Sequence, residues 1–586
     1  MRTGDLITAC SLFDQSISIE TNPHCLFQAA LCYRKSERLN DALSLLKRLE
    51  EQGDTNPPAL LLRADIFSAI DRHHHALPLY QALAGIEDAQ IQYSAALGLF
   101  QCSDIEASLQ LATALSEGGD NALSHQARLL KGRCLAAAQR YDEARQTFSE
   151  VEAAPALKKA ARYRTARLDL HLGHFAAAET ALKNLLKIDE PPRGAQETLL
   201  QTLVHSGQTD LALNMVQAAT DKGCDLSWLR HGTELLSELD APEPLQLLTS
   251  RWDAAPRPDI FRELCSRLLE ADDLSQATAL LADYANAFGE DTHWQWARIR
   301  LLEKEEAYEE VLQLHNADPF SSMEIVCHAY FALGRYEQAF ETAQRLCRSA
   351  PGDQYFIALL ATALRCLDDP RQAALIDPKL LFTRDRLLES RPDGGTDLPF
   401  WMAAQGAIAQ HHSMKSAPPT QSVVGGIQTP GNLLVQTQEL ALLKLKTLLN
   451  ETAQDFFDNA LFPDLAEPHP LRLFRPKDIT MHASWAIQGR AGTYHHSHVH
   501  SKGWYSGTCY IEVPESIEDG DKAGHLILGE PPFRTKHALP PIATIRPTVG
   551  KMVLFPSYYW HSTRPYSGGG QRQVVAFDFG LENRFV

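Results

Sequence analysis

The chain has 586 residues, with 73 acidic and 55 basic side chains and a formal net charge of −18 at pH 7. This length exceeds what one hydrophobic core serves, so several domains or an array of repeats are expected. Residues 1–399 carry the whole acidic excess, which argues against nucleic acid as a partner because phosphate binding needs clustered Lys and Arg.

Targeting features and cysteine usage indicate a cytoplasmic protein. No apolar run approaches the length of a membrane span, so we expect no membrane association. Residues 1–20 lack the basic start and apolar core of a secretory signal. The 11 cysteines are scattered without a Cys-x-x-Cys pair, which predicts reduced thiols and a cytoplasmic location.

A helical repeat array is predicted for most of the chain. Residues from about 22 to 375 are rich in Ala, Leu and Gln, with apolar positions at helical spacing. A small residue that follows a polar or acidic pair recurs roughly every 34 residues, a period that resembles the tetratricopeptide repeat and its paired antiparallel helices. We therefore expect a solenoid over residues 1–376, with about ten or eleven units. The recurring residues are Ala42, Ala76, Ala107, Ala144, Ala178, Ala212, Pro244, Ala277, Val311, Ala339 and Ala373.

The unit around residue 339 gives the most detailed prediction. Gly334 is expected to permit the turn between two helices, and Tyr336 to pack at the start of the second helix. Pro351 is expected to stop that helix. The small residue at 339 is needed because two helices approach closely there.

A junction is predicted over residues 377–421. It contains a turn-rich break at Arg391–Gly395, an apolar helix at Leu398–Ala409 and a polar loop from His411 to Ser422 that we interpret as a connector or lid. A short Gly-rich stretch, Val423–Thr429, then precedes an amphipathic helix expected over about Val435–Ala460.

The last segment, residues 422–586, is predicted to form a sandwich or jelly roll. Short β-branched and aromatic runs alternate with Gly/Pro/Asp turns such as Glu518–Asp521, a pattern typical of such folds. Strands are expected at Asp478–Ile487, Thr508–Val513, His525–Leu528, Ala543–Ile545, Met552–Phe555 and Gln573–Phe579.

A histidine cluster lies within this segment. His498 and His500 are one residue apart, and two such side chains point to the same face of a strand. A distant third histidine, His561, can complete three sites on one side of a metal if an antiparallel neighbour brings it in. Imidazole suits Fe, Zn, Cu and Ni alike, so the ligand set alone does not name the ion.

The spaced motifs of residues 422–579 resemble the jelly-roll Fe(II)/2-oxoglutarate oxygenases, and more narrowly a bacterial and phage group of them. The group's pattern is His-x-His, Ser-Gly-x-x-Tyr, Phe-Pro-Ser-x-x-x-His and then Arg. The matching positions here are His498, His500, Ser506-Gly507, Tyr510, Phe555-Pro556-Ser557, His561 and Arg572. Together with the repeat period, this resemblance implies a multidomain chain: an all-α solenoid followed by a double-stranded β-helix (jelly-roll) domain that uses Fe(II) and 2-oxoglutarate.

The resemblance makes His498 and His561 the first and last iron ligands. His500 stands where most of the superfamily has a carboxylate, and a neutral imidazole leaves the iron one charge more positive. Three alternatives are open: His500 ligates, water takes its place, or a carboxylate such as Asp578 is recruited. We favour His500, and place His495 and His496 at the flank of the site.

By the same resemblance Arg572 binds the distal carboxylate of 2-oxoglutarate, because a planar guanidinium pairs with a carboxylate through two parallel hydrogen bonds. The superfamily often has a hydroxyl two residues after this arginine, where this chain has Val574. Another hydroxyl must then help, and Tyr510, Ser506 and Thr563 are the candidates. Because His500 is not a small residue that would admit halide, hydroxylation is expected rather than halogenation.

The preferred hypothesis is a dioxygenase that hydroxylates a protein or peptide presented by the solenoid. Other protein hydroxylases join helical repeats to such a core, which is an analogy of fold. The alternatives are an oxygenase acting on a small or carrier-bound metabolite, and a repeat scaffold with an inactive jelly roll. The sequence gives no substrate and no oligomeric state.

Overall fold

The computed structural model forms two compact units. The first holds Met1–Leu168 with Asp189–Pro192, and the second holds Asp169–Ile188 with Arg193–Glu582. Apart from isolated positions, the structure describes residues 22–36, 38–53, 56–69, 73–102, 104–221, 244–317, 322–387, 398–411, 422–429, 432–437, 439–465, 469–476, 479–517 and 522–580.

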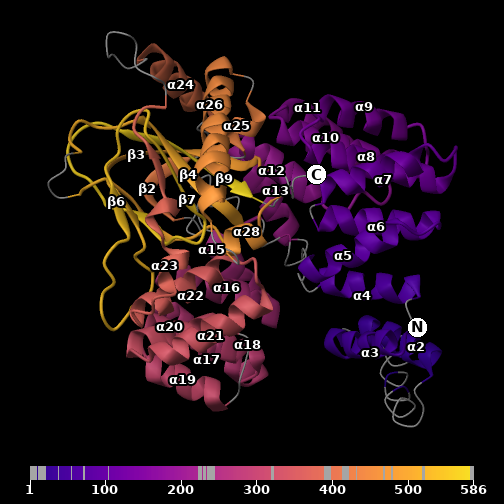
Figure 1. Ribbon diagram of the computed structural model, residues 1–586, viewed down its shortest axis with the longest axis horizontal. Coiled ribbons are helices and arrows are strands. Elements are labelled where there is room, and N and C mark those ends of the chain that lie inside the picture. Colours follow the sequence, from indigo (N-terminus) through magenta and orange to yellow (C-terminus); the bar gives the residue numbers. More distant parts are fainter. Residues whose placement is uncertain are drawn as a thin grey trace. The chain divides into compact units, whose positions relative to one another are not determined.

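Paired helices make up both the first unit and the beginning of the second (Figure 1), as the repeat period predicts. No helix among the described residues is long and apolar enough to cross a membrane. The repeat helices are α2 (Pro23–Lys35), α3 (Leu39–Glu51), α4 (Pro57–Ala69), α5 (His73–Ala84), α6 (Ala89–Gln101), α7 (Ile105–Ser116), α8 (Ala122–Ala137), α9 (Tyr141–Val151), α10 (Lys158–His171), α11 (Phe175–Leu185), α12 (Ala195–His205), α13 (Thr209–Asp221), α15 (Pro244–Ala254), α16 (Pro258–Glu270), α17 (Leu274–Phe288), α18 (Thr292–Lys304), α19 (Tyr308–Ala317), α20 (Met323–Leu333), α21 (Tyr336–Ser349), α22 (Gln354–Cys366) and α23 (Gln372–Leu375).

The recurring small residues lie near the start of the second helix of each pair, where a neighbouring helix approaches. Those at positions 42, 76, 144, 178, 212, 277, 311 and 339 are at most 1% exposed. Ala373 differs and is exposed, because its helix α23 is a single turn that ends the array. Glycines serve the same purpose in the first helices: a Cβ on Gly132 would lie 2.5 Å from the Phe148 ring.

The turn predicted at Gly334 is confirmed. Gly334 caps α20 with a φ of +73°, a left-handed conformation that side chains with a Cβ rarely adopt. Helix α21 begins two residues later, at Tyr336, and ends at Ser349 just before Pro351. Local sequence therefore dictates the repeat boundaries here.

The junction differs from a plain linker. Its helix α24 (Leu398–His411) forms where expected, but residues 382–384 form strand β1 (Phe382–Arg384), which pairs with β7. The sheet therefore begins some forty residues before the expected start at residue 422. The predicted break at 391–395, most of the polar loop and the turn at 518–521 lie outside the described residues.

The described strands form one curled, antiparallel, nine-stranded sheet that resembles a jelly roll, as predicted. Its order is β1-β7-β4-β9-β3-β8-β5-β6, and β2 pairs with β3. Helix α26 (Leu440–Phe456), continued by the π-helical turn η2 (Phe457–Leu461), lies along the sheet (Figure 1). The remaining strands are β2 (Val423–Gln428), β3 (Met481–His498), β4 (Gly503–Glu512), β5 (Leu526–Leu528), β6 (Ala543–Ile545), β7 (Met552–Pro556), β8 (His561–Thr563) and β9 (Arg572–Gly580).

One hydrophobic core runs from the last repeat helices into the sheet. It contains Phe331 and Leu359 of α20 and α22 together with Phe555 and Phe577 of β7 and β9. Polar bonds cross the same boundary: the Trp560 indole donates to Thr362 Oγ1 over 2.9 Å. The final repeats thus belong to the same folded body as the sheet.

Candidate metal centre

Three histidines meet where β3 runs beside β8. His498, the last residue of β3, is paired in register with His561, the first residue of β8, so the antiparallel neighbour predicted from sequence delivers the third histidine. His500 arrives differently from the expectation. It lies beyond the end of β3, in a turn where its N–H donates to the Ser557 carbonyl over 3.2 Å, so strand alternation does not place it.

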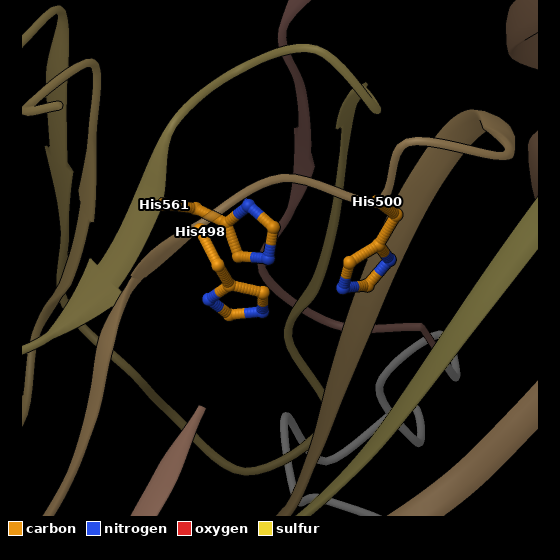
Figure 2. Close-up of side chains that lie close together, drawn as sticks. All are labelled: His498, His500 and His561. Atoms are coloured by element: carbon orange, nitrogen blue, oxygen red, sulfur yellow. The ribbon is translucent and has the colours of Figure 1, made fainter. Parts of the chain in front are cut away.

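The three imidazoles face a common space (Figure 2). The nitrogen atoms that they offer to a metal all lie within 4.8 Å of one another. Neighbouring rings are close, with centroids of His498 and His561 separated by 4.1 Å. This spacing fits three nitrogen ligands around one ion.

The hydrogen bonds of the rings suit metal binding. Nδ1 of His498 donates to the His496 carbonyl over 2.8 Å, and Nδ1 of His561 donates to the Tyr559 carbonyl over 3.0 Å. A carbonyl only accepts, so each Nδ1 must carry the proton, which leaves Nε2 with its lone pair. His500 has its Nδ1 2.6 Å from Asp578 Oδ1, which again leaves Nε2 for a metal.

Burial keeps two of these rings neutral. It lowers the pKa of His498 to about 3, with help from the charge of His500, and it lowers the pKa of His561 well below the usual value. Burial also opposes the charged form of His500, but the Asp578 carboxylate outweighs it and raises the pKa of that ring. Neutral imidazole is the form that binds a metal, so His498 and His561 need lose no proton at neutral pH.

Asp578 does not join the ligand cluster. It is buried on β9, opposite Ser506 of β4, and the Ser506 hydroxyl donates to its Oδ1 over 2.7 Å. Burial opposes ionisation of Asp578, yet the charge of His500, hydrogen bonds from His500 and Ser506 and the charge of His482 together lower the pKa of the carboxyl. The carboxylate considered as an alternative ligand thus lies behind the imidazole of His500.

The flanking histidines have different surroundings. His496 is exposed, whereas His495 lines the cavity and its Nδ1 lies 3.1 Å from Ser422 Oγ. The same hydroxyl lies 3.2 Å from Nε2 of His498, so Ser422 bridges the two rings. Sequence reasoning did not single out Ser422, which lies in the polar stretch before β2 and has no motif of its own.

Arg572 lies on the same cavity wall. Its guanidinium, 4% exposed, donates through Nη1 to the Gly524 carbonyl over 3.0 Å and through Nη2 to Thr563 Oγ1 over 3.3 Å. It forms no ion pair with any carboxylate that the structure describes. A buried guanidinium has five N–H donors, so several remain for a bound anion.

Of the candidate hydroxyls, Tyr510 and Thr563 line this cavity beside Arg572. Burial raises the pKa of Tyr510 to about 12, so its phenol is protonated and available as a donor. Ser506 also lines the cavity, but its proton goes to Asp578. The rest of the wall is largely apolar, with side chains that include Trp485, Ile487, Leu526 and Phe555.

Fold and site define a helical-repeat chain with a metal-binding, jelly-roll-like domain. Residues 483–578, which contain all three histidines and Arg572, match the family model described as "Putative 2OG-Fe(II) oxygenase". Fe(II) and 2-oxoglutarate are the cofactors of that family. No curated protein matches the chain.

Solved structures resemble each half of the molecule. A tetratricopeptide repeat protein from Parabacteroides merdae matches 40% of this chain and 91% of its own, with 17% identity and a TM-score of 0.35. A Pseudomonas putida prolyl-4-hydroxylase matches 36% and 99%, with 13% identity and a TM-score of 0.24. HygX from Streptomyces hygroscopicus, with nickel and 2-oxoglutarate bound, matches 36% and 86%, with 10% identity and a TM-score of 0.24. Likenesses this distant assign no function.

Proposed function

We propose that this protein is an Fe(II)- and 2-oxoglutarate-dependent dioxygenase that hydroxylates a protein or peptide. The observation that supports the reaction is the position of His498, His500 and His561 in one cavity with Arg572. Three imidazole nitrogen donors suit Fe(II), and a buried guanidinium without a carboxylate partner among the described residues suits a dicarboxylate cosubstrate.

The side chains of the cavity have separate tasks in this proposal. His498, His500 and His561 hold the iron through Nε2. Arg572 binds the distal carboxylate of 2-oxoglutarate, and the hydroxyls of Tyr510 and Thr563 flank it. Bound Fe(II) and 2-oxoglutarate, together with O₂, would supply the oxidising chemistry: one oxygen atom of O₂ converts a substrate C–H to C–OH, and the other enters the succinate that forms as 2-oxoglutarate loses CO₂. The apolar wall formed by Trp485, Leu526 and Phe555 excludes water around the cosubstrate.

The test is an anaerobic titration of Fe(II) and 2-oxoglutarate, followed by visible absorption, on the full chain. We expect a charge-transfer band that requires both components, disappears in His498→Ala and needs more 2-oxoglutarate in Arg572→Ala. The matched control is Arg564→Ala, which removes a half-exposed arginine paired with Glu530 and leaves the band unchanged. Absence of both the band and O₂-dependent succinate in the wild type would refute the proposal.

A cluster of arginines on the repeats supports a peptide partner. Arg133 of α8 and Arg167 of α10 stand on equivalent helices of consecutive repeats, and Arg164 lies one turn before Arg167. The guanidinium of Arg133 lies 4.4 Å from the ring centre of Phe100, and its Nε is buried without a hydrogen-bond partner. None of the three forms an ion pair with a described carboxylate, although the chain is strongly acidic.

The positive charges of these three arginines repel one another. Burial, followed by the charges of Arg133 and Arg167, lowers the pKa of Arg164 to about 10. An arginine cluster kept without carboxylates is suited to an acidic ligand, because guanidinium pairs with carboxylate through two parallel bonds. The proposed partner is therefore an acidic peptide segment, rather than the basic peptide that the net charge alone would attract.

Fluorescence anisotropy with labelled hexaglutamate and hexalysine peptides tests this partner. We expect the wild type to bind hexaglutamate and the double variant Arg133→Ala/Arg167→Ala to lose at least tenfold in affinity, as for the loss of one charge-assisted pair. The control is Arg162→Ala. Arg162 lies on helix α10, as Arg167 does, but it is more exposed and is paired with Glu152. Preference for hexalysine would contradict the assignment.

Gain of one oxygen atom by a bound peptide, seen by mass spectrometry, would connect binding to the reaction.

A further inference from the structure

The cavity wall has an imbalance of charge. As far as the structure describes it, the wall holds three metal-facing histidines and a buried arginine, but no Asp or Glu. A divalent ion bound by three neutral imidazoles keeps its full charge of +2, and the guanidinium of Arg572 adds another positive charge nearby. His561 and Arg572 are buried, so some compensation of this charge by the protein is expected.

Asp578 lies where it can supply that compensation. Its Oδ1 is 2.6 Å from Nδ1 of His500, on the side of the ring opposite to Nε2, and the carboxyl is 6% exposed. A carboxylate only accepts hydrogen bonds, so His500 donates its Nδ1–H. The bond orients the ring and makes Nε2 a stronger donor to a metal.

Two serines hold the carboxylate in place. The Ser506 hydroxyl uses its proton to donate to Asp578, so the Ser557 hydroxyl, 2.8 Å away, donates to Ser506. Ser557 is enclosed in turn, because a Cβ on Gly503 would lie 2.5 Å from its Oγ. The hydrogen-bonded series Ser557–Ser506–Asp578–His500 comes from β4, β9 and the segments after β7 and β3.

We propose that Asp578 is the positioning residue of the metal centre, and that the hydrogen-bonded pair His500–Asp578 replaces the carboxylate ligand found in most related sites. This inference rests on the proposed iron site. His500 gives the metal its nitrogen, and Asp578 provides the negative charge one ring further out. The three alternatives left open by the sequence thus reduce to one arrangement that uses both residues.

Metal binding tests the pair on the full-length protein. Co(II) affinity and the Co(II) visible spectrum are measured for the wild type, Asp578→Asn, His500→Ala and a control, Asp169→Asn. The control changes another buried aspartate whose Oδ1 lies 3.4 Å from a histidine nitrogen, Nδ1 of His174. Asp169 lies among the repeat helices, far along the chain from Asp578. We expect Asp578→Asn to bind Co(II) about 10–100-fold more weakly and to shift the visible bands, as for loss of a hydrogen-bonding partner behind a ligand. Asp169→Asn should match the wild type.

Pulsed EPR on the Cu(II)-loaded protein counts the imidazole ligands. We expect three in the wild type and in Asp578→Asn. Two imidazoles in the wild type, or wild-type affinity in His500→Ala combined with loss in Asp578→Asn, would mean that Asp578 ligates directly and would overturn the inference. Wild-type affinity and spectrum in Asp578→Asn would overturn it as well.

A further variant tests the inference even if Asp578→Asn does not fold. Ser506→Ala removes the hydroxyl that holds the carboxylate but keeps its charge, and it should weaken Co(II) binding severalfold with a smaller spectral shift. An unchanged Ser506→Ala would then overturn the inference. If the wild type itself bound neither Co(II) nor Fe(II), the proposed function would fail first, and the two failures are therefore distinguishable.

Discussion

In both the repeats and the sheet, a glycine makes room for a phenylalanine ring and hydrogen bonds join separate elements. The two regions differ in how far apart along the chain the joined residues are. In the first unit, a glycine at position 132 admits the ring of Phe148, and the Ser108 hydroxyl bonds a carbonyl 12 residues away. In the sheet, Gly507 admits the ring of Phe577, and His500 bonds a carboxylate 78 residues away. The repeats therefore confine the effect of a change to neighbouring helices, whereas the sheet transmits it to the metal centre.

The largest expected effect comes from a ligand. His561→Ala removes one of three nitrogen donors, so Fe(II) affinity should fall by more than the roughly 10–100-fold typical of losing a residue behind a ligand. Isothermal titration under anaerobic conditions measures it. His205→Ala, at the end of helix α12 in the repeats, should leave the affinity unchanged. Equal losses in both variants would break the distinction between the two regions.

The next largest effects are expected from substitution of two glycines. Gly507→Ala would place a Cβ 2.3 Å from the Phe577 ring, and Gly132→Ala would place one 2.5 Å from the Phe148 ring, so each should cost about 1–3 kcal/mol of stability. Only Gly507→Ala should also weaken Fe(II) binding, because Gly507 follows Ser506 and lines the cavity. Chemical denaturation combined with metal titration separates the two effects. Weaker Fe(II) binding in Gly132→Ala would contradict the local character of the repeats.

A smaller effect is expected where repeat and sheet meet. Trp560→Phe removes the indole N–H that donates to Thr362, and Thr362→Val removes the acceptor. A double-mutant cycle on unfolding free energy should give a coupling of about 1 kcal/mol, the usual net value of such a bond. A coupling near zero would mean that apolar packing alone joins the two regions.

The smallest effect concerns the charge of one helix cap. Burial opposes ionisation of Asp291, but hydrogen bonds from the Trp294 amide, the Tyr284 hydroxyl and the His293 amide outweigh it and lower its pKa. A lowered pKa means that Asp291 stabilises the fold fully above its unfolded-state pKa, and that this is lost as pH falls through the folded-state pKa. Asp291→Asn keeps the cap and loses only the charge, so at neutral pH it should cost a few tenths of a kcal/mol. Thermal unfolding at pH 7 and pH 3 should show a smaller difference between Asp291→Asn and the wild type at the lower pH.

Much of this arrangement was accessible from the sequence, because repeats and strands with strong local patterns form where predicted. Strand β6 has the expected bounds, and β7 and β9 are within one residue of them. Strand β8 was missed because it forms through pairing with β3 and β5, not through a pattern of its own. Strand β1 was missed for the same reason, since its partner β7 lies far along the chain.

The candidate site was only partly accessible for a related reason. Motif order brought His498, His561 and Arg572 together, but side-chain alternation was the wrong argument for His500, because β3 ends at His498. The position of Asp578 behind His500 depends on the pairing of β4 with β9, which no local pattern encodes. Spacing in sequence therefore predicted the candidate ligands, and tertiary pairing decided which hydrogen-bond partner each of these side chains received.

The hydrophobic core that joins α20 and α22 to the sheet limits how this architecture can change by duplication. Gain or loss of a whole repeat among the earlier helices alters only contacts between similar neighbours. The same event at α20–α22 would remove the surface against which Trp560, the residue next to the candidate ligand His561, packs. The number of repeats can therefore change in the early part of the array, whereas the last repeats must be kept together with the sheet as one unit.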